Sequence, residues 1–317
     1  MQKYICKLND FKGIDLANGI ISSIPASIRQ ALNFMIDIDF VSNSDQIENI
    51  NANMPIVDFL NNPNIKVLRS TRLLDPRKPN EKLFMTLPSG EPIDDSLPRD
   101  YIDYLRDTNL LIFDTETNEE YYIETTGHLA AVAETINEAR RANRAIKSGK
   151  NLPLDAEFIA DHINAHILGA DYGRYRSEYY HDIVGLYGCE WCIPGGDKVD
   201  KEMNELLDWY NNHSQGLHPI VRAAILHAEF VRIHPFADGN GRTARLLSNY
   251  ELVKNGFPTI TIKAKNRQAY VDALNEAIMS GDITSLVELF AKRMISRQRL
   301  YHKKLLECDL DNELENE

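Results

Sequence analysis

The sequence predicts a mainly α-helical protein with one small β-hairpin and an additional α+β region in its N-terminal half. In several long segments, apolar residues recur at steps of three and four, which is the period of a helix face. Two shorter stretches, 110–123 and 178–193, instead mix aromatic and β-branched residues, which is typical of strands. With 317 residues, of which 43% are hydrophobic, the chain is long enough for one large domain or two ordinary ones.

The N-terminal half is predicted to alternate helices with extended and irregular segments. Residues 24–40 form a helix, and residues 70–100, which are rich in Pro, Arg and Asp, form an irregular connection. The segment LLIFDTETNEEYYI at 110–123 predicts two strands around a polar turn, and a second helix spans 127–145. The sequence SGKNLP at 148–153 marks the predicted boundary to the next domain.

The predicted hairpin at 178–193 reads EYYHDIVGLYGCEWCI and contains two cysteines in a CxxC arrangement. One such pair is only half of a zinc site, so we assign Cys189 and Cys192 to the hairpin itself. The four cysteines of the chain do not form the pattern of a disulfide framework.

The most informative segment is HPFADGNGRTAR at 234–245, which lies between two helical patterns. The upstream helix is predicted to end near His234, because a proline follows and disfavours the helical conformation of the residue before it. Gly239 and Gly241 allow backbone angles that other residues avoid, so a tight loop comes next. The helical period then resumes.

A glycine loop that leads into a helix presents unpaired N–H groups at the positive end of the helix dipole, so it suits a phosphate. Arg242 and Arg245 share one face of the first turn, and each guanidinium can hold phosphate oxygens through a fork of donors. Asp238 would repel a bare phosphate but would bind Mg2+ carried by a nucleotide. His234 can take a proton from a hydroxyl that attacks phosphorus. The segment therefore combines a base, a metal ligand and a phosphate cradle.

Each part of this segment also has an ordinary interpretation. A histidine at a helix end is usually structural or exposed, Gly-Asn-Gly is usually a turn, and two arginines three apart usually form a solvated face. No packing requirement asks for all of them in this order, so their combination favours a functional site. A Walker loop fits poorly, because the Lys-Ser/Thr pair is absent and no strand leads directly into the segment.

The segment HPFADGNGR, followed by Arg245, resembles the signature of the Fic family, His-x-Phe-x-Asp/Glu-Gly-Asn-Gly-Arg-x-x-Arg, at every defined position. The resemblance extends from about residue 155 to 295 and includes GRYR at 173–176 and RQAYVDALNEA at 267–277. It implies a Fic-type helical bundle at 151–300 whose hairpin is a flap, preceded by a regulatory or adaptor region at 1–150.

The resemblance implies transfer of AMP from ATP to a Ser, Thr or Tyr hydroxyl of a protein, with release of pyrophosphate. His234 would be the general base, and Asp238 would bind the Mg2+ that bridges the α and β phosphates. Phe236 is expected to anchor the loop in the core. The other residues of the signature would cradle and hold the phosphates: Gly239, Asn240, Gly241, Arg242 and Arg245.

Two further regions carry expectations from the family. The flap of Fic proteins aligns an extended target segment by strand addition, which places Ile183, Val184 and Gly185 at its working edge. An ordinary surface hairpin is the alternative. Arg267 and Tyr270 match the R-x-x-Y segment of the family and are candidates for the pocket of the nucleotide base, although packing would explain both.

Many family members are inhibited by a helix with the pattern Ser/Thr-x-x-x-Glu-Gly/Asn, whose Glu pairs with the second arginine of the signature. The segment SDQIEN fits this pattern, with its defined positions at Ser44, Glu48 and Asn49. We expect an inhibitory helix at 44–50 and a resting contact between Glu48 and Arg245, because desolvation drives both groups to pair. A plain surface helix is the alternative, since the pattern is short and lies far from His234 along the chain.

Composition excludes several other classes of protein. A net charge of -12 and a pI near 5.3 argue against a nucleic-acid partner. Neither a signal peptide nor an apolar run of about 20 residues is visible, so we expect a cytoplasmic protein without membrane contact. Residues 301–317 end in ECDLDNELENE, which predicts a frayed acidic tail.

The predicted function is that of an autoinhibited protein adenylyltransferase that uses ATP and Mg2+ and modifies a protein, its own chain included. Within the enzyme class, the alternatives are removal of AMP by the same site, with Glu48 orienting water, and transfer of another nucleotide, a phosphate or phosphocholine. A non-catalytic binding module is the alternative from a different class, and the intact signature disfavours it. The oligomeric state, including a homodimer, stays open.

Overall fold

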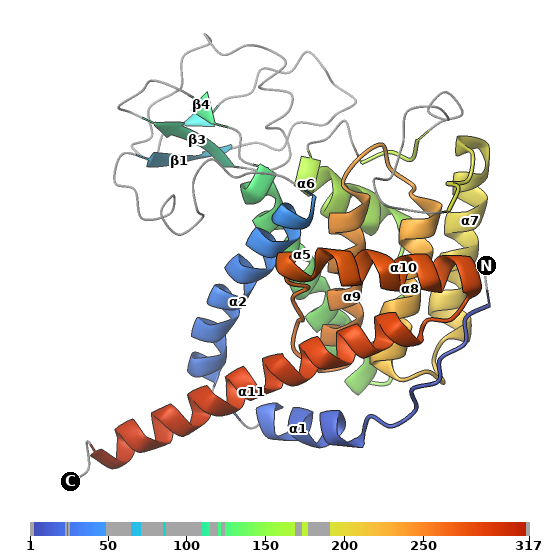
Figure 1. The fold of residues 1–317 in the computed structure, drawn as a ribbon. Coiled ribbons are helices and arrows are strands. Elements are labelled where there is room, and N and C mark those ends of the chain that lie inside the picture. Colours follow the sequence, from blue (N-terminus) through green and yellow to red (C-terminus); the bar gives the residue numbers. More distant parts are fainter. Residues whose placement is uncertain are drawn as a thin grey trace.

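The structure is a computed structural model of the 317-residue chain. It describes residues 3–22, 24, 26–48, 65–70, 85–86, 110–114, 120–121, 124–168, 173–176 and 191–314. These residues form a mainly helical fold with a small sheet, as the sequence predicts (Figure 1). None of the helices in these ranges combines the length and apolar character that a bilayer-crossing segment requires.

The helical elements follow one another in chain order: α1 (Lys12–Ser22), α2 (Ala26–Ile47), α5 (Glu124–Lys147), the π-helical segment η1 (Phe158–Asn164), α6 (Ala165–Leu168), α7 (Gly196–Asp208), the π-helical segment η4 (Trp209–His213), α8 (Pro219–Ile233), α9 (Asn240–Lys254), the 3-10 turn η5 (Ala264–Asn266), α10 (Arg267–Ser280) and α11 (Thr284–Leu314). The strands are β1 (Ile65–Ser70), β2 (Met85–Thr86), β3 (Leu110–Asp114) and β4 (Glu120–Tyr121).

Helices α8 and α9 form the centre of the bundle, and α5, α7, α10 and α11 pack around them (Figure 1). Thirteen of the fifteen residues of α8 are buried, so this helix needs partners on every side rather than along one stripe. Pro219 occupies its first turn, where a missing N–H is harmless. The predicted helices on either side of the glycine loop are therefore confirmed.

The polar residues of the central helices are paired with one another. Glu251 of α9 is fully buried and accepts hydrogen bonds from the guanidinium of Arg222 and the hydroxyl of Tyr210. Burial raises the pKa of Glu251, and the charge of Arg222 opposes that effect. This network joins α8, α9 and η4 at the end of the bundle away from the glycine loop.

The N-terminal helices contribute to the main hydrophobic core, and α1 and α2 also form a smaller cluster with Tyr301. Phe40, Val41 and Ile47 of α2 and Val132 of α5 are buried in one cluster with the apolar residues of α8 and α9. The helices predicted at 24–40 and 127–145 are thus present as α2 and α5, with longer bounds. Buried residues from both sides of the predicted boundary at 148–153 lie in this cluster.

The four strands form an antiparallel sheet in the order β2-β1-β3-β4. Strands β3 and β4 pair with Ile112 opposite Tyr121, which confirms the two strands predicted at 110–123. Strand β1 and the two-residue strand β2 are additional, and β2 lies in the segment predicted to be irregular. A ladder of two residues is too short to leave a periodic pattern in the sequence.

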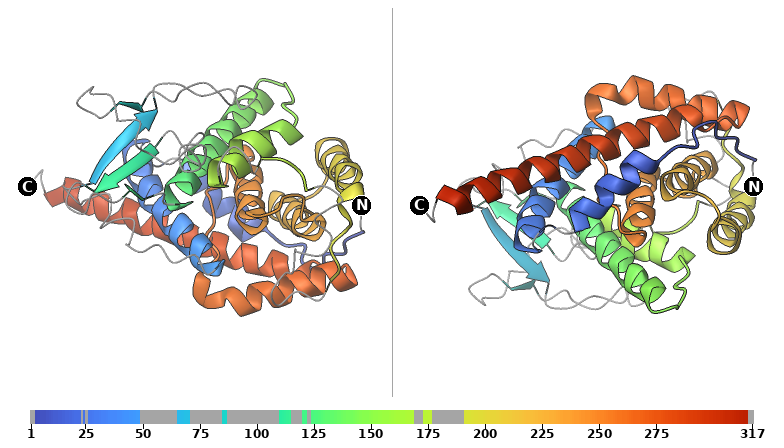
Figure 2. Two further views of the ribbon diagram at one scale, coloured as in Figure 1. Left: turned by 90° about the horizontal axis from the view of Figure 1, so that it is seen from above. Right: turned by 90° about the horizontal axis from the view of Figure 1, so that it is seen from below.

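The first described residues pack against the C-terminal helices. Ile5 accepts a hydrogen bond from the N–H of Ile283 and donates one to the carbonyl of Gly281, which ties the chain start to the turn between α10 and α11. Helix α1 then runs alongside α11 (Figure 2). Tyr301 of α11 is buried, and α11 continues to Leu314, so the range 301–317 predicted as an acidic tail begins within this helix.

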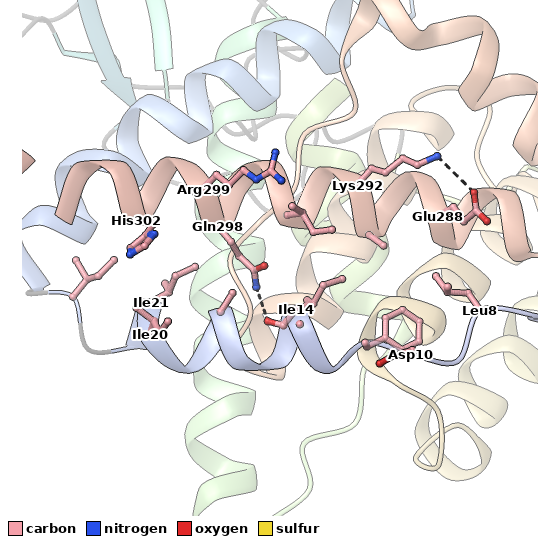
Figure 3. Close-up of a pocket in the computed structure, with 16 residues that line it drawn as sticks. Leu8, Asp10, Ile14, Ile20, Ile21, Glu288, Lys292, Gln298, Arg299 and His302 are labelled. Carbon is pink, nitrogen blue, oxygen red and sulfur yellow. Dashed lines mark hydrogen bonds and ion pairs between the residues drawn. The ribbon is translucent and has the colours of Figure 1, made fainter. Parts of the chain in front are cut away.

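A cavity of about 620 Å³ lies between α1 and α11. Figure 3 shows Ile14, Ile20 and Ile21 of α1 facing Gln298 and His302 of α11 across it. Its lining residues fall within 8–24 and 288–302, so it lies apart from the glycine loop.

Candidate active site

His234 ends α8 in an unusual backbone conformation. Its φ of 52° and ψ of 59° lie in the left-handed region, and it is the one non-glycine residue of the described ranges with a positive φ. Its N–H still donates to the carbonyl of Phe230, at 2.9 Å. The chain therefore leaves the helix abruptly at His234, and surrounding contacts must hold a conformation that costs about 1–2 kcal/mol for a residue with a Cβ.

The carbonyl groups at the end of α8 are bound by Arg176. Its Nε donates to the carbonyl of His234 at 2.7 Å, and one Nη donates to that of Ile233 at 3.1 Å. The backbone N–H of Arg176 also donates to the carbonyl of Pro235, at 2.8 Å. Sequence analysis placed this arginine in the GRYR segment but gave it no role.

The loop after His234 is held to itself and to the core. The side-chain amide of Asn240 accepts from the N–H of Phe236 at 2.9 Å and donates to its carbonyl at 2.8 Å. The ring of Phe236 is fully buried against Tyr175 and Phe230, so it anchors the loop as predicted. The side chain of Asn240 thus stabilises the conformation of the loop.

A second asparagine, Asn164, supports the loop from the π-helical segment η1. Its amide donates to the carbonyl of Asp238 at 3.0 Å and is fully buried. Gly239 follows with a φ of 74°, and a Cβ there would lie 2.8 Å from Asn164 Nδ2 and from Leu168 Cδ1. Gly239 is therefore required both by its backbone angle and by the close approach of η1 and α6. Nothing in the sequence pattern marked Asn164.

Asp238 and Arg242 occupy the open side of the loop. The side chain of Asp238 is 64% exposed, and its Oδ1 lies 3.6 Å from an Nη of Arg242. Arg242 itself is almost fully buried at the start of α9, where the first N–H groups of the helix lack helical partners. The loop thus presents an exposed carboxylate beside a helix N-terminus and a buried positive charge.

The second arginine of the signature contacts the segment SDQIEN. Arg245 Nε donates to the hydroxyl of Ser44 at 2.8 Å, and one Nη donates to Glu48 Oε1 at 2.7 Å. The same Nη reaches the carbonyl of Ser44 at 3.1 Å. The expected contact between Glu48 and Arg245 is present, with Ser44 at the end of α2 and Glu48 in the turn that follows.

Gly241 allows the carboxylate of Glu48 to approach the loop. A Cβ at Gly241 would clash with Glu48 Oε1. The side chain of Glu48 is 36% exposed, so it lies at the surface of the site rather than deep in the core.

The charges around Glu48 keep it ionised. Burial alone would raise its pKa, but the charges of Arg245, Arg242 and Arg267 together hold the pKa of Glu48 below its ordinary value. For Arg245, burial acts to lower the pKa. The charge of Glu48 and the hydroxyl of Tyr270 outweigh burial, so the pKa of Arg245 lies above its ordinary value. The two groups therefore form a true ion pair.

His234 is nearly buried, with 7% of its surface exposed. Burial lowers its pKa to about 4, and the charge of Arg176 acts in the same direction. The Val231 carbonyl and the carboxylate of Glu48 oppose this shift only in part. At neutral pH the imidazole is therefore uncharged and able to accept a proton.

The two residues predicted to line a base pocket, Arg267 and Tyr270, make contacts with α2 and with the core. Tyr270 is buried, and its hydroxyl bonds to Nε2 of the buried His227 at 2.7 Å, so it supports the core beside Arg245 instead of facing solvent. Arg267 Nε donates to the carbonyl of Ile47 at 2.9 Å, which caps the last turn of α2. The R-x-x-Y spacing marks the start of α10, and at this position tertiary packing fixes both side chains.

Some predicted residues cannot be placed. The flap residues Ile183, Val184 and Gly185 and the last inhibitory position, Asn49, lie outside the residues that the structure describes. Cys192 is described and carries a free, exposed thiol.

Asp238 is the carboxylate of the loop that could contribute to a metal site. Among the described residues, no group of three or more His, Cys, Asp or Glu side chains could hold an ion by itself. Asp238 supplies one exposed carboxylate at the loop, which matches an ion that keeps most of its ligands from phosphates and water.

Comparison with known proteins agrees with this geometry. Residues 153–252 match the model of the Fic/DOC family, and this range contains the whole loop. The chain belongs to the Fic/DOC family. A Fic protein adenylyltransferase of Nematostella vectensis is 30% identical over 244 residues, which are 73% of this chain and 55% of that protein. Protein adenylyltransferase fic-1 of Caenorhabditis elegans is 41% identical over 95 residues, 30% of this chain and 18% of that one.

Solved Fic structures share the fold. A Fic domain containing signaling protein from Bacteroides thetaiotaomicron has a TM-score of 0.63 at 23% identity, over 92% of this chain and 96% of that one. Fic-1 of Caenorhabditis elegans has a TM-score of 0.61 at 19% identity, over 94% and 72%. This chain spans about half or less of the length of the curated relatives that it matches.

Proposed function

We propose that this chain is a protein adenylyltransferase, which transfers AMP from ATP to a Ser, Thr or Tyr hydroxyl of a protein, and that Glu48 restrains it. The observation that carries the proposal is the single loop at 234–241, which joins an uncharged buried histidine to a helix N-terminus. The names of the adenylyltransferase relatives support the same activity.

In this proposal each residue of the loop has one task. The phosphates of ATP lie against the first N–H groups of α9, where the helix dipole favours negative charge. Arg242 and Arg245 hold the β and γ phosphates. Asp238 holds the Mg2+ that neutralises phosphate charge, and the reaction then depends on positioning and charge stabilisation.

His234 serves as the general base. The target hydroxyl attacks the α phosphorus, its proton passes to the imidazole, and pyrophosphate leaves on the opposite side. In the free protein the pKa of His234 is about 4. The anionic phosphates of bound ATP raise it toward neutral pH, which makes the imidazole a better base when the substrate is present.

Glu48 restrains the reaction by occupying the place of the γ phosphate. Its carboxylate lies 2.7 Å from Arg245 and holds a negative charge, so a phosphate that approaches the same arginine meets repulsion. Displacement of Glu48 frees Arg245 for ATP.

The test is incorporation of label into protein from α-labelled and γ-labelled ATP in parallel. Glu48→Gly is expected to incorporate α label faster than the unmodified chain, and His234→Ala is expected to lose incorporation by about 10²- to 10⁴-fold. Gln46→Ala, at an exposed position in the last turn of α2, removes a neighbouring polar side chain without weakening that helix and is expected to leave the rate unchanged.

Other outcomes overturn the proposal in distinct ways. Label from the γ position would make the chain a kinase. Label from neither position, together with loss of AMP from an already adenylylated protein, would assign the site to AMP removal. Equal rates of AMP incorporation for Glu48→Gly and the unmodified chain would be compatible with the proposed activity but would reject the proposed restraint by Glu48.

A further inference from the structure

We propose that Arg176 is a positioning residue, which holds His234 in its left-handed conformation and so aims the imidazole. This inference rests on the proposed function. It concerns a residue outside the signature and outside the restraint by Glu48.

The backbone of the GRYR segment lies directly beside the catalytic loop. Tyr175 forms an antiparallel bridge with Phe236, and the N–H of Arg176 donates to Pro235. Gly173 permits a close approach of the segment to η1, because a Cβ there would lie 2.8 Å from the carbonyl oxygen of Ala160. The segment 173–176 is therefore placed by backbone contacts, independently of the arginine side chain.

The guanidinium of Arg176 binds backbone carbonyls on two sides. Nε and one Nη donate to His234 and Ile233, the last residues of α8, and the same Nη donates to Pro194, at 2.5 Å. Within the described part of the chain, each hydrogen bond of this side chain goes to a carbonyl oxygen. Only 5% of the residue is exposed, so water does not compete for these carbonyls.

This arrangement supplies what the end of α8 lacks. The last carbonyls of a helix have no helical partners, and inside a protein they must be bound by another group. A positive charge at a helix C-terminus is also favoured by the dipole. A planar fork can bind adjacent carbonyls together, whereas a lysine offers one compact ammonium. Arg176 thus fixes the peptide of His234 from outside the loop.

The consequence for catalysis is that loss of Arg176 should affect turnover but not the binding of ATP. A displacement of about 1 Å at a reacting group can cost roughly 100-fold in rate. The phosphates are held from α9, and none of the hydrogen bonds of Arg176 reaches that helix. Loss of Arg176 should therefore lower kcat and leave the affinity for ATP nearly unchanged.

The experiment compares Arg176→Gln and Arg176→Lys, both in the Glu48→Gly background, with Arg297→Gln as the matched control. Arg297 is also buried and donates to Thr261 in another part of the bundle, so its loss reports the general cost of removing a buried arginine. We expect kcat to fall about 10- to 100-fold in both Arg176 variants, with the Kd for ATP within twofold. Arg297→Gln should change neither quantity by more than twofold.

An NMR titration of the histidine ring protons provides a readout that does not depend on turnover. The chain has nine histidines, and the signal missing from His234→Ala identifies His234. In Arg176→Gln its pKa should rise toward the ordinary value near 6.5, because a positive neighbour is lost, and in Arg176→Lys it should stay low.

The results separate this inference from the proposed function. If none of the variants transfers AMP, the proposed function fails, yet altered chemical shifts of the His234 ring protons in Arg176→Lys, which keeps the positive charge, would still support the positioning role. An unchanged kcat, or an unchanged His234 titration in Arg176→Gln, would overturn it. If Arg176→Gln does not fold, kcat in Arg176→Lys decides: activity equal to the Arg297→Gln control would reject the inference.

Discussion

The buried pair of Asp45 and His128 should control how firmly Glu48 is held. His128 Nδ1 lies 2.8 Å from Asp45 Oδ1, and the two side chains are 0% and 3% exposed. Burial lowers the pKa of His128, so the imidazole is neutral and donates to the carboxylate. Asp45 lies between Ser44 and Glu48 in the chain, so this bond ties the end of α2 to α5.

The perturbation is His128→Phe, which keeps an aromatic ring against Phe40 but removes the donor. A hydrogen bond to a charged group contributes about 1.5–3 kcal/mol, and removal leaves a buried carboxylate without this donor. For a chain of this size that loss corresponds to a decrease in Tm of roughly 2–5 °C. Because the end of α2 loses one of its anchors, incorporation of AMP should rise by up to about tenfold, less than in Glu48→Gly.

The assay pairs thermal unfolding with initial rates of AMP incorporation. Thr135→Val is the matched control, since Thr135 is buried on the same helix and bonds only to the carbonyl of Ala131 among the described contacts. If His128→Phe lowers Tm but incorporates AMP no faster than Thr135→Val, the pair does not restrain Glu48. An unchanged Tm would refute the energetic argument itself.

Three more outcomes can be measured. The free energy of unfolding should decrease as pH falls from about 6.5 to 4, because His227 and His234, with pKa values of about 3 and about 4 in the folded state, bind protons only when unfolded; urea titrations at several pH values check this. Tyr270→Phe in the Glu48→Gly background should weaken ATP binding by up to about tenfold, measured by calorimetry, since Arg245 loses a hydroxyl partner. Gly239→Ala should lower Tm, and it should lower the single-turnover rate at least tenfold. The reason is that the φ of 74° and the contacts at 2.8 Å strain any side chain at this position. An unaffected rate would show that catalysis does not need the loop in this fixed conformation.

Sequence reasoning succeeded where function requires a local pattern. The loop at 234–241 could be predicted because proline, two glycines and the arginines that follow dictate a helix end, a turn and a helix start within a few residues. Glu48 was also found from a short pattern, although its contact with Arg245 spans 197 positions. Both cases depend on residue types that have few other uses in that order.

The residues that sequence reasoning missed are single polar side chains whose partners lie far away in the sequence. Arg176, Asn164 and His128 each meet a partner brought close only by tertiary packing, and no periodicity marks them. Tyr270 was singled out by a family spacing, and that spacing did not indicate the bond of its hydroxyl to the buried His227. Such positions depend on which helices become neighbours, and that information is spread over the whole chain.

The separation of 197 positions between Glu48 and Arg245 also orders events during synthesis. A ribosome that adds about 5–20 residues per second makes Glu48 some 10–40 s before Arg245. The acidic partner therefore already exists whenever α9 emerges and folds. A newly made chain therefore never passes through a stage in which the arginine is complete and its carboxylate is still untranslated, so the restraint proposed for Glu48 has both of its partners as soon as α9 is made.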